Sequence, residues 1–164
     1  MNKTLIFKLL TLLLILINMF FIFSFSAEKA SVSKETSKKV TEKILEVTVS
    51  DFHKKPEPVK KNMVKALDGK IRSLAHFSEY TLLGFLVALH LSLYKMSKIK
   101  SASLALSGCT FYAVIDEIHQ HFVPGRSFQF IDIFTDFSGA LLGVLLLTLI
   151  IIFSEKTTKK SAVS

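Results

Sequence analysis

Long stretches without a charged side chain constrain this sequence more than any other feature. They cover residues 9–27, 80–94, 101–115 and 137–154. A helix needs about 20 mostly apolar residues to cross the hydrocarbon core of a bilayer. The first and last stretches, of 19 and 18 residues, nearly reach that length alone, and the middle two reach it by including neighbouring polar residues. The sequence therefore predicts four membrane-spanning helices, at roughly 5–26, 73–94, 101–122 and 132–153.

Composition agrees with a membrane protein and excludes a basic soluble one. Half of the 164 residues are hydrophobic, and the mean hydropathy is +0.46 although the net charge is +8. A disordered or nucleic-acid-binding chain of that charge is far more polar. The single cysteine, Cys109, lies in an apolar stretch, which excludes an internal disulfide and a thiolate metal cluster. We predict an all-α, polytopic membrane helix bundle whose partner is the lipid bilayer and not a nucleic acid.

The same pattern predicts four regions along the chain. A first transmembrane helix over 1–27 precedes a polar extracytoplasmic segment over 28–70, a three-helix membrane core over 71–154 and a cytoplasmic tail over 155–164. The first region has a second interpretation, because two lysines, an apolar stretch and small residues at its end also describe a signal peptide. Its uncharged length exceeds the roughly 7–15 residues of a signal-peptide core, which favours a retained helix.

The polar segment contains residues at helical spacing. Val40, Ile44 and Val47 predict a short amphipathic helix. A second one is predicted from Val59 to Leu67, before Asp68 and Gly69 loosen the chain. Lysine-rich amphipathic helices bind lipid surfaces, so these helices either lie along the membrane or belong to a solvated linker.

Lysines next to the spans predict the orientation. They occur before the first span, in the short loop 95–100 and after the last span. With four spans these three places share one side, and the positive-inside rule assigns that side to the cytoplasm. The stretch 28–72, with 12 basic and 7 acidic residues, argues against this assignment. We expect a multi-pass protein of the cell membrane with both termini in the cytoplasm.

Ionisable side chains within the predicted spans gather at one membrane face. The start of the second span, the end of the third and the start of the fourth all lie on that side. Charged residues at membrane depth cost about 2.5–3.5 kcal/mol on insertion scales, and they usually face the bundle interior and mark function. The candidate ligand-binding residues are His76, Glu79, Tyr80, Asp116, Glu117, Gln120, Arg126, Asp132 and Asp136.

Helical spacing explains why these residues form one candidate site. His76, Glu79 and Tyr80 lie on one helical face. On the next predicted helix, Gln120 follows Asp116 by four residues and Glu117 by three, so it can form a hydrogen bond with either. Pro124 and Gly125 predict a turn that presents the Arg126 guanidinium near the carboxylates. That guanidinium either recognises an anion through its two-pronged fork or neutralises an acidic residue and fixes the loop.

Gly139 and Gly143 are four residues apart in the last predicted span. This small-xxx-small spacing allows two helix backbones to approach closely. Such motifs are frequent in membrane helices, so we interpret both glycines as packing residues.

Three ordered blocks resemble the VanZ-like family of membrane proteins. They are Arg72 to Tyr80, Asp116 to Ser127 with its Asp-Glu-x-x-Gln and Pro-Gly-Arg elements, and Asp132 to Gly143. The resemblance covers roughly 70–153 and implies a small multi-spanning protein of a family named for a member linked to low-level teicoplanin resistance. Position 136 is often Asn in that pattern and is Asp here.

Three functions from different classes remain open at this point. The first is binding of a cell-envelope lipid or an anionic, lipid-linked peptidoglycan precursor at the outer face, with a contribution to glycopeptide resistance. The second is an intramembrane enzyme that uses carboxylate and histidine acid–base chemistry. The third is a membrane scaffold or small transporter. We expect no cofactor and no metal, because His119 and His121 point to different helix faces.

Overall fold

The protein consists of helices, as expected from the sequence. The computed structural model describes residues 2–161, so the last residues of the predicted tail 155–164 lie outside the described part. The helices are α1 (Lys3–Ser26), α2 (Ala30–Thr48), the 3-10 turn η1 (Phe52–Lys54), α3 (Glu57–Ser92), α4 (Lys98–His121) and α5 (Phe130–Ser161). The prediction of an all-α fold is confirmed.

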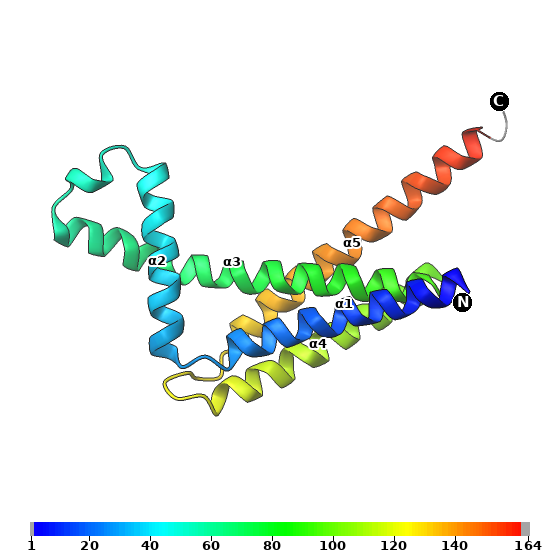
Figure 1. The fold of residues 1–164 in the computed structure, drawn as a ribbon, viewed down its shortest axis with the longest axis horizontal. Coiled ribbons are helices and arrows are strands. Elements are labelled where there is room, and N and C mark those ends of the chain that lie inside the picture. Colours follow the sequence, from blue (N-terminus) through cyan, green and yellow to red (C-terminus); the bar gives the residue numbers. More distant parts are fainter. Residues whose placement is uncertain (1, 162–164) are drawn as a thin grey trace.

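Three helices are long and apolar enough to cross a membrane, namely α1, α3 and α5. The remaining predicted span, α4, has the same length as α1 and runs beside α1 and α3 (Figure 1). Its end carries Asp116, Glu117 and Gln120, which make it more polar than the other three. All three side chains are buried against the bundle, so tertiary packing stabilises them there. That α4 spans the membrane stays a prediction.

The closest packing in the bundle is between α3 and α5, which cross each other in Figure 1. A Cβ atom added at Gly84 would overlap the backbone of Ala140. One added at Gly139 or Gly143 would overlap the backbone of Phe77 or Thr81, respectively. The two glycines predicted to pack against a helix therefore lie at this crossing, where only glycine lets the backbones approach so closely.

Helix α1 is an integral part of the bundle. Ile15 and Ile22 belong to its buried core. The Thr11 hydroxyl forms a 2.8 Å hydrogen bond with His90 Nδ1 on α3, and the Tyr112 hydroxyl of α4 donates to the Met19 carbonyl oxygen at 2.7 Å. These contacts pack α1 against α3 and α4, and its retention in the mature protein stays a prediction.

The polar segment contains the predicted amphipathic helix, but a different face of it packs. Helix α2 runs across the end of the bundle (Figure 1). It buries Thr41 and Leu45, whereas Val47 is 88% exposed. The predicted helix is confirmed, and the residues that it buries against the rest of the protein, Thr41 and Leu45, each lie one position beyond Val40 and Ile44. Whether the stripe of Val40, Ile44 and Val47 faces lipid stays a prediction.

The sequence predicts that the helix ends at Asp68 and Gly69, and that prediction was wrong. Helix α3 continues without interruption from the polar segment into the bundle, so the predicted boundary at residue 70 falls inside it. A small satellite core of Leu45, Phe52 and Val64 packs α2 and η1 against the first turns of α3. That core stabilises the helix beyond the bundle, which outweighs the modest cost of a glycine in its interior.

Both described ends of the chain lie at the same end of the bundle (Figure 1). The loop from α3 to α4 lies at that end too, whereas α2 and the loop from α4 to α5 lie at the opposite end. Helix α5 continues to Ser161, past the predicted end of its span. This arrangement fits two termini on one membrane side, and which side is cytoplasmic stays a prediction.

Candidate functional site

The loop between α4 and α5 is a tight turn set by its sequence. The Arg126 amide donates to the Val123 carbonyl oxygen at 3.1 Å, and Gly125 between them has a φ of 81°. Pro124 and Gly125 thus occupy the two central positions that a type II turn requires, proline for its fixed φ and glycine for the positive one. The turn directs Arg126 back toward the bundle.

Arg126 uses its guanidinium to fasten this loop to the end of α1. Nη2 donates to the Phe25 carbonyl oxygen at 2.9 Å, and Nε donates to the Glu28 carbonyl oxygen at 3.0 Å. Nη1 donates to Gln120 Oε1 at 2.8 Å. Burial, followed by the nearby charge of Arg72, lowers the pKa of Arg126, although guanidinium remains protonated at any physiological pH.

Of the two roles left open for Arg126, direct pairing with an acidic residue is not what the structure shows. Within the described residues, no carboxylate lies at ion-pair distance from this guanidinium, and two of its acceptors are backbone oxygens. The turn aims Arg126 toward the end of α1, which sequence spacing could not reveal. Because only three of its five N–H groups are used in these bonds, some remain for a ligand.

Gln120 forms hydrogen bonds with both Arg126 and Asp116 and so links the two side chains. Its Nε2 atom donates to Asp116 Oδ2 at 3.0 Å and to the Ser26 hydroxyl oxygen at 3.2 Å. The Ser26 hydroxyl in turn donates to Asp116 Oδ2 at 2.7 Å. One carboxylate oxygen of Asp116 is therefore held by two donors, while Oδ1 is buried without a hydrogen-bond partner.

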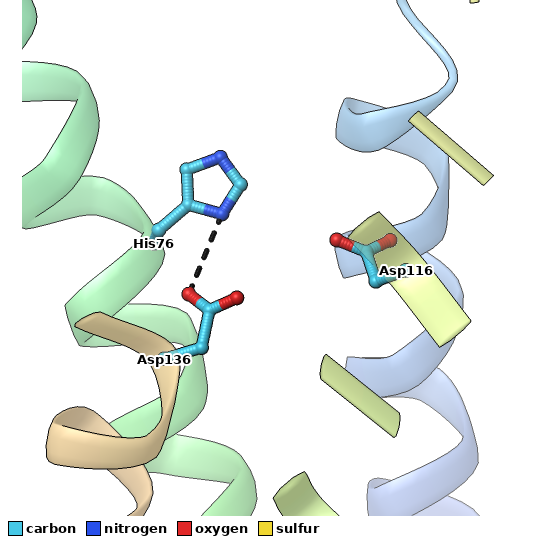
Figure 2. Close-up of side chains that lie close together, drawn as sticks. All are labelled: His76, Asp116 and Asp136. Carbon is cyan, nitrogen blue, oxygen red and sulfur yellow. Dashed lines mark ion pairs between the residues drawn. The ribbon is translucent and has the colours of Figure 1, made fainter. Parts of the chain in front are cut away.

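Asp116 faces His76 and Asp136 across the interior of the bundle (Figure 2). His76 Nδ1 lies 3.7 Å from Asp136 Oδ1, and one atom from each of the three side chains lies within 4.8 Å of the others. Asp116 and Asp136 are 2% and 1% exposed. His76 Nδ1 and Asp136 Oδ1 also have no hydrogen-bond partner. We call these three residues the His-Asp-Asp cluster.

The other predicted site residues lie outside the His-Asp-Asp cluster. Glu117 accepts a 2.6 Å hydrogen bond from the Gln129 amide, so its carboxylate caps the first turn of α5, where a negative charge is favourable. The Tyr80 hydroxyl is buried without a partner. Glu79 and Asp132 line two hollows that open beside the cluster.

These two hollows lie side by side under α2 and share Ser33, Arg72, His76 and Arg126. The first, of about 220 Å³, has mostly polar and charged walls that include Lys34 and Asp132. The second, of about 230 Å³, exposes mostly apolar surface, although Glu28 and Glu79 also line it. Its apolar residues are Phe25, Val40, Ile71 and Ala75. We call the two together the α2 cleft.

Sequence reasoning missed three residues of this region. Ser26 was one of the small residues at the end of the first apolar stretch. Arg72 began the first family-like block without receiving a role, and Lys34 lay in the polar segment. No local pattern identifies Ser26, because its role depends on contact with Asp116, 90 residues away. The basic residues of the polar segment gave no sign of which of them face the bundle.

Comparison with known proteins gives one family. A family model described as VanZ/LLP1 matches residues 10–152, which is most of the chain. Searches of curated proteins and of solved structures gave no match.

Proposed function

The chain belongs to the VanZ/LLP1 family of membrane proteins, and from this premise and the α2 cleft we propose that it binds an anionic, lipid-linked precursor of the cell envelope at the outer membrane face. The proposal rests on one observation: a charged hollow and a hollow with mostly apolar surface lie next to each other, and both are lined by Arg72 and Arg126. A lipid phosphate needs both kinds of surface at once.

The charged hollow has the donors that a phosphate requires. Lys34, Arg72 and Arg126 line it, against one carboxylate from Asp132. Arg72 binds Asp68 through Nη2 at 3.2 Å, while its Nε is buried without a hydrogen-bond partner. Arginine binds phosphate through parallel N–H donors, and lysine adds a compact charge. Three cations beside spare N–H groups favour an anion in this hollow.

The apolar hollow supplies a place for the beginning of a lipid chain. It adjoins the charged hollow through His76 and opens between α2 and the middle of α3. Helix α2 crosses the end of the bundle, opposite the two termini (Figure 1). An amphipathic helix in that position is typical of the lipid interface, which is where a headgroup meets its acyl or prenyl chain. Outer-face action follows if the predicted orientation holds.

Binding of a spin-labelled phosphatidic acid tests the proposal. The full-length protein is placed in nanodiscs of phosphatidylcholine, and the labelled lipid is titrated while immobilised spectra are recorded. We expect saturable binding that exceeds binding of labelled phosphatidylcholine. Arg72→Gln and Lys34→Gln should each weaken it about 10- to 100-fold, because loss of one charge-assisted bond costs roughly 1.5–3 kcal/mol.

Lys43→Gln is the matched control. Lys43 is exposed on the same helix as Lys34 and lies outside the α2 cleft, so the substitution removes the same charge. Equal losses in Lys34→Gln and Lys43→Gln would show that net charge, not the cleft, attracts the lipid. Failure to distinguish phosphatidic acid from phosphatidylcholine would refute the proposal.

A contribution to teicoplanin resistance follows from the same binding step. A protein that holds a lipid-linked precursor can alter how much of it is open to a glycopeptide at the cell surface. Expression in a susceptible bacterium should raise the inhibitory concentration of teicoplanin, and the Arg72→Gln, Lys34→Gln double variant at equal abundance should not.

An intramembrane enzyme is the second candidate function. The His-Asp-Asp cluster favours it, because a histidine and two carboxylates with unpartnered atoms lie directly beside the cleft. Such groups can transfer protons to or from a bound substrate. Turnover of a lipid phosphate by the wild-type protein, lost in Asp136→Asn, would establish this function.

A further inference from the structure

Several polar atoms at the centre of the bundle have no partner. Within the described residues, His76 Nδ1, Asp116 Oδ1, Asp136 Oδ1 and the Tyr80 hydroxyl are buried and form no hydrogen bond. A buried polar group without a partner destabilises the folded protein, and more so when it is charged. So many of them in one place call for a ligand that satisfies them together.

We propose that the His-Asp-Asp cluster binds one divalent metal ion, which sequence analysis did not foresee. The three residues come from three helices, His76 from α3, Asp116 from α4 and Asp136 from α5. Each offers one ligand atom within 4.8 Å of the other two. No contiguous sequence motif could have revealed them, since the nearest two in the chain are 20 residues apart.

The donor set is suited to a small divalent ion. Nitrogen and carboxylate ligands bind Zn²⁺ at about 2.0–2.2 Å, so two ligands of one ion lie at most roughly 4.4 Å apart. An inward movement of each side chain by a fraction of an ångström would bring the cluster within that limit. One imidazole with two carboxylates suits Zn²⁺ or Mn²⁺, since imidazole favours the first and carboxylates favour the second.

Charge supports the same conclusion. Asp116 and Asp136 are almost fully buried, and among the described residues the only ion pair of either is that of Asp136 with His76. Buried carboxylates are usually paired with a cation or coordinate a metal. The arginines beside the cleft point elsewhere, Arg72 to Asp68 and Arg126 to Gln120 and backbone oxygens. A divalent ion would balance the charge of both carboxylates.

The surroundings of Asp116 resemble the outer shell of a metal site. Ser26 and Gln120 hold Oδ2, which leaves Oδ1 buried and unpartnered on the same carboxylate. Outer hydrogen bonds of this kind fix the orientation of a metal ligand. Tyr80 follows His76 by four residues on α3, and its hydroxyl lies on the same helix face. His76 also lines both hollows of the α2 cleft, which gives an ion a path to the cluster.

Titration with Mn²⁺ alone tests the site without any lipid, so its outcome is independent of the proposed lipid binding. The full-length protein is purified in detergent, treated with a chelator, exchanged into metal-free buffer and titrated with Mn²⁺ while free ion is measured by electron paramagnetic resonance. We expect one Mn²⁺ per chain and nitrogen modulation from His76 in the pulsed spectrum. Competition by Zn²⁺ then shows which ion binds more tightly.

Five substitutions, one of them a control, separate the site from its surroundings. His76→Gln, Asp116→Asn and Asp136→Asn remove ligands and should weaken binding more than Ser26→Ala, which removes an outer bond of a kind worth about 10–100-fold in affinity. Glu155→Gln is the control, because it removes a carboxylate from the same helix as Asp136 at the end far from the cluster and outside the α2 cleft. Folding of each variant is checked by the reaction of buried Cys109 with a thiol dye on heating.

Two results would overturn the proposal. One is a wild-type protein that binds no Mn²⁺ or Zn²⁺, and this result needs no variant to fold. The other is binding in which Glu155→Gln weakens affinity as much as Asp136→Asn, or in which the wild-type spectrum lacks nitrogen modulation. Lipid binding that persists in a protein unable to hold metal would leave the proposed function intact.

Discussion

Arg126 shows how one side chain organises the site. It joins the α4–α5 loop to two backbone oxygens at the end of α1 and to Gln120, which holds Asp116. The Pro-Gly-Arg and Asp-Glu-x-x-Gln elements therefore act together. The turn orients the Arg126 guanidinium toward Gln120, and Gln120 donates a hydrogen bond to the Asp116 carboxylate, which faces His76.

Substitution of Arg126 should lower stability even when its charge is kept. Arg126→Lys and Arg126→Ala both lose the fork that contacts three acceptors, and we expect each to cost at least about 1.5–3 kcal/mol, the value of a hydrogen bond to a charged group. Thermal unfolding in detergent, followed by dye reaction at Cys109, measures the loss. Ser127→Ala is the neighbouring control. A lysine variant as stable as wild type would show that the fork does not hold the loop.

Glu117 and Asp116 are neighbours with different expected roles. Glu117 caps the amino end of α5, so Glu117→Gln keeps an acceptor for the Gln129 amide and loses only its charge. We expect a loss of stability on the order of 0.3–1 kcal/mol and unchanged Mn²⁺ affinity. Asp116→Asn should instead abolish Mn²⁺ binding. Equal effects of the two substitutions on metal affinity would contradict this division.

At the scale of the element, the crossing of α3 and α5 depends on glycine. Gly139 and Gly143 lie against the backbones of Phe77 and Thr81, and Gly84 lies against Ala140. Because these contacts are with rigid backbone, a larger side chain could be accommodated only by moving a whole helix. That movement would carry Asp136 away from His76, since both lie within one turn of the crossing.

Replacement of Gly139 and Gly143 by leucine should therefore separate the helices. We expect a lower yield of detergent-stable protein and a lower unfolding temperature, because bulk at a small-xxx-small contact prevents close approach. Gly108→Leu is a suitable control, because an added Cβ at Gly108 meets no atom within 4 Å. A double variant that purifies and unfolds like the wild type would show that the crossing is more adaptable than its geometry indicates.

At the scale of the whole molecule, the fold separates two ends. The termini lie at one end, and α2 lies with the α4–α5 loop at the other (Figure 1). The α2 cleft and the His-Asp-Asp cluster both belong to the second end. Cysteine labelling of intact cells can determine which side that end faces.

Single cysteines at Ser31 and Lys156, introduced after Cys109→Ser, test the orientation. Both positions are exposed, Ser31 near the start of α2 and Lys156 near the end of α5, and these two helix ends lie at opposite ends of the molecule (Figure 1). With cytoplasmic termini, a membrane-impermeant thiol reagent should label the cysteine at position 31 in intact cells and the one at position 156 only after lysis. The reverse pattern would place the cleft in the cytoplasm and contradict action at the outer face.

The sequence by itself determined the class of this protein and the end at which its polar residues meet. Uncharged stretches near the length of a bilayer predict spanning helices, and helical spacing predicts which ionisable residues share a face, because both depend only on local geometry. The glycine spacing of the last helix likewise indicated a close contact without naming its partner.

Only the tertiary structure decided which of those residues meet. The continuity of α3 through Gly69 and the buried face of α2 both depend on a satellite core formed by residues distant in sequence. His76, Asp116 and Asp136 converge because α5 crosses α3 at glycine contacts. Ser26 reaches Asp116 because α1 packs on α4. Such contacts arise from the packing of whole helices, and no local pattern of residues encodes them.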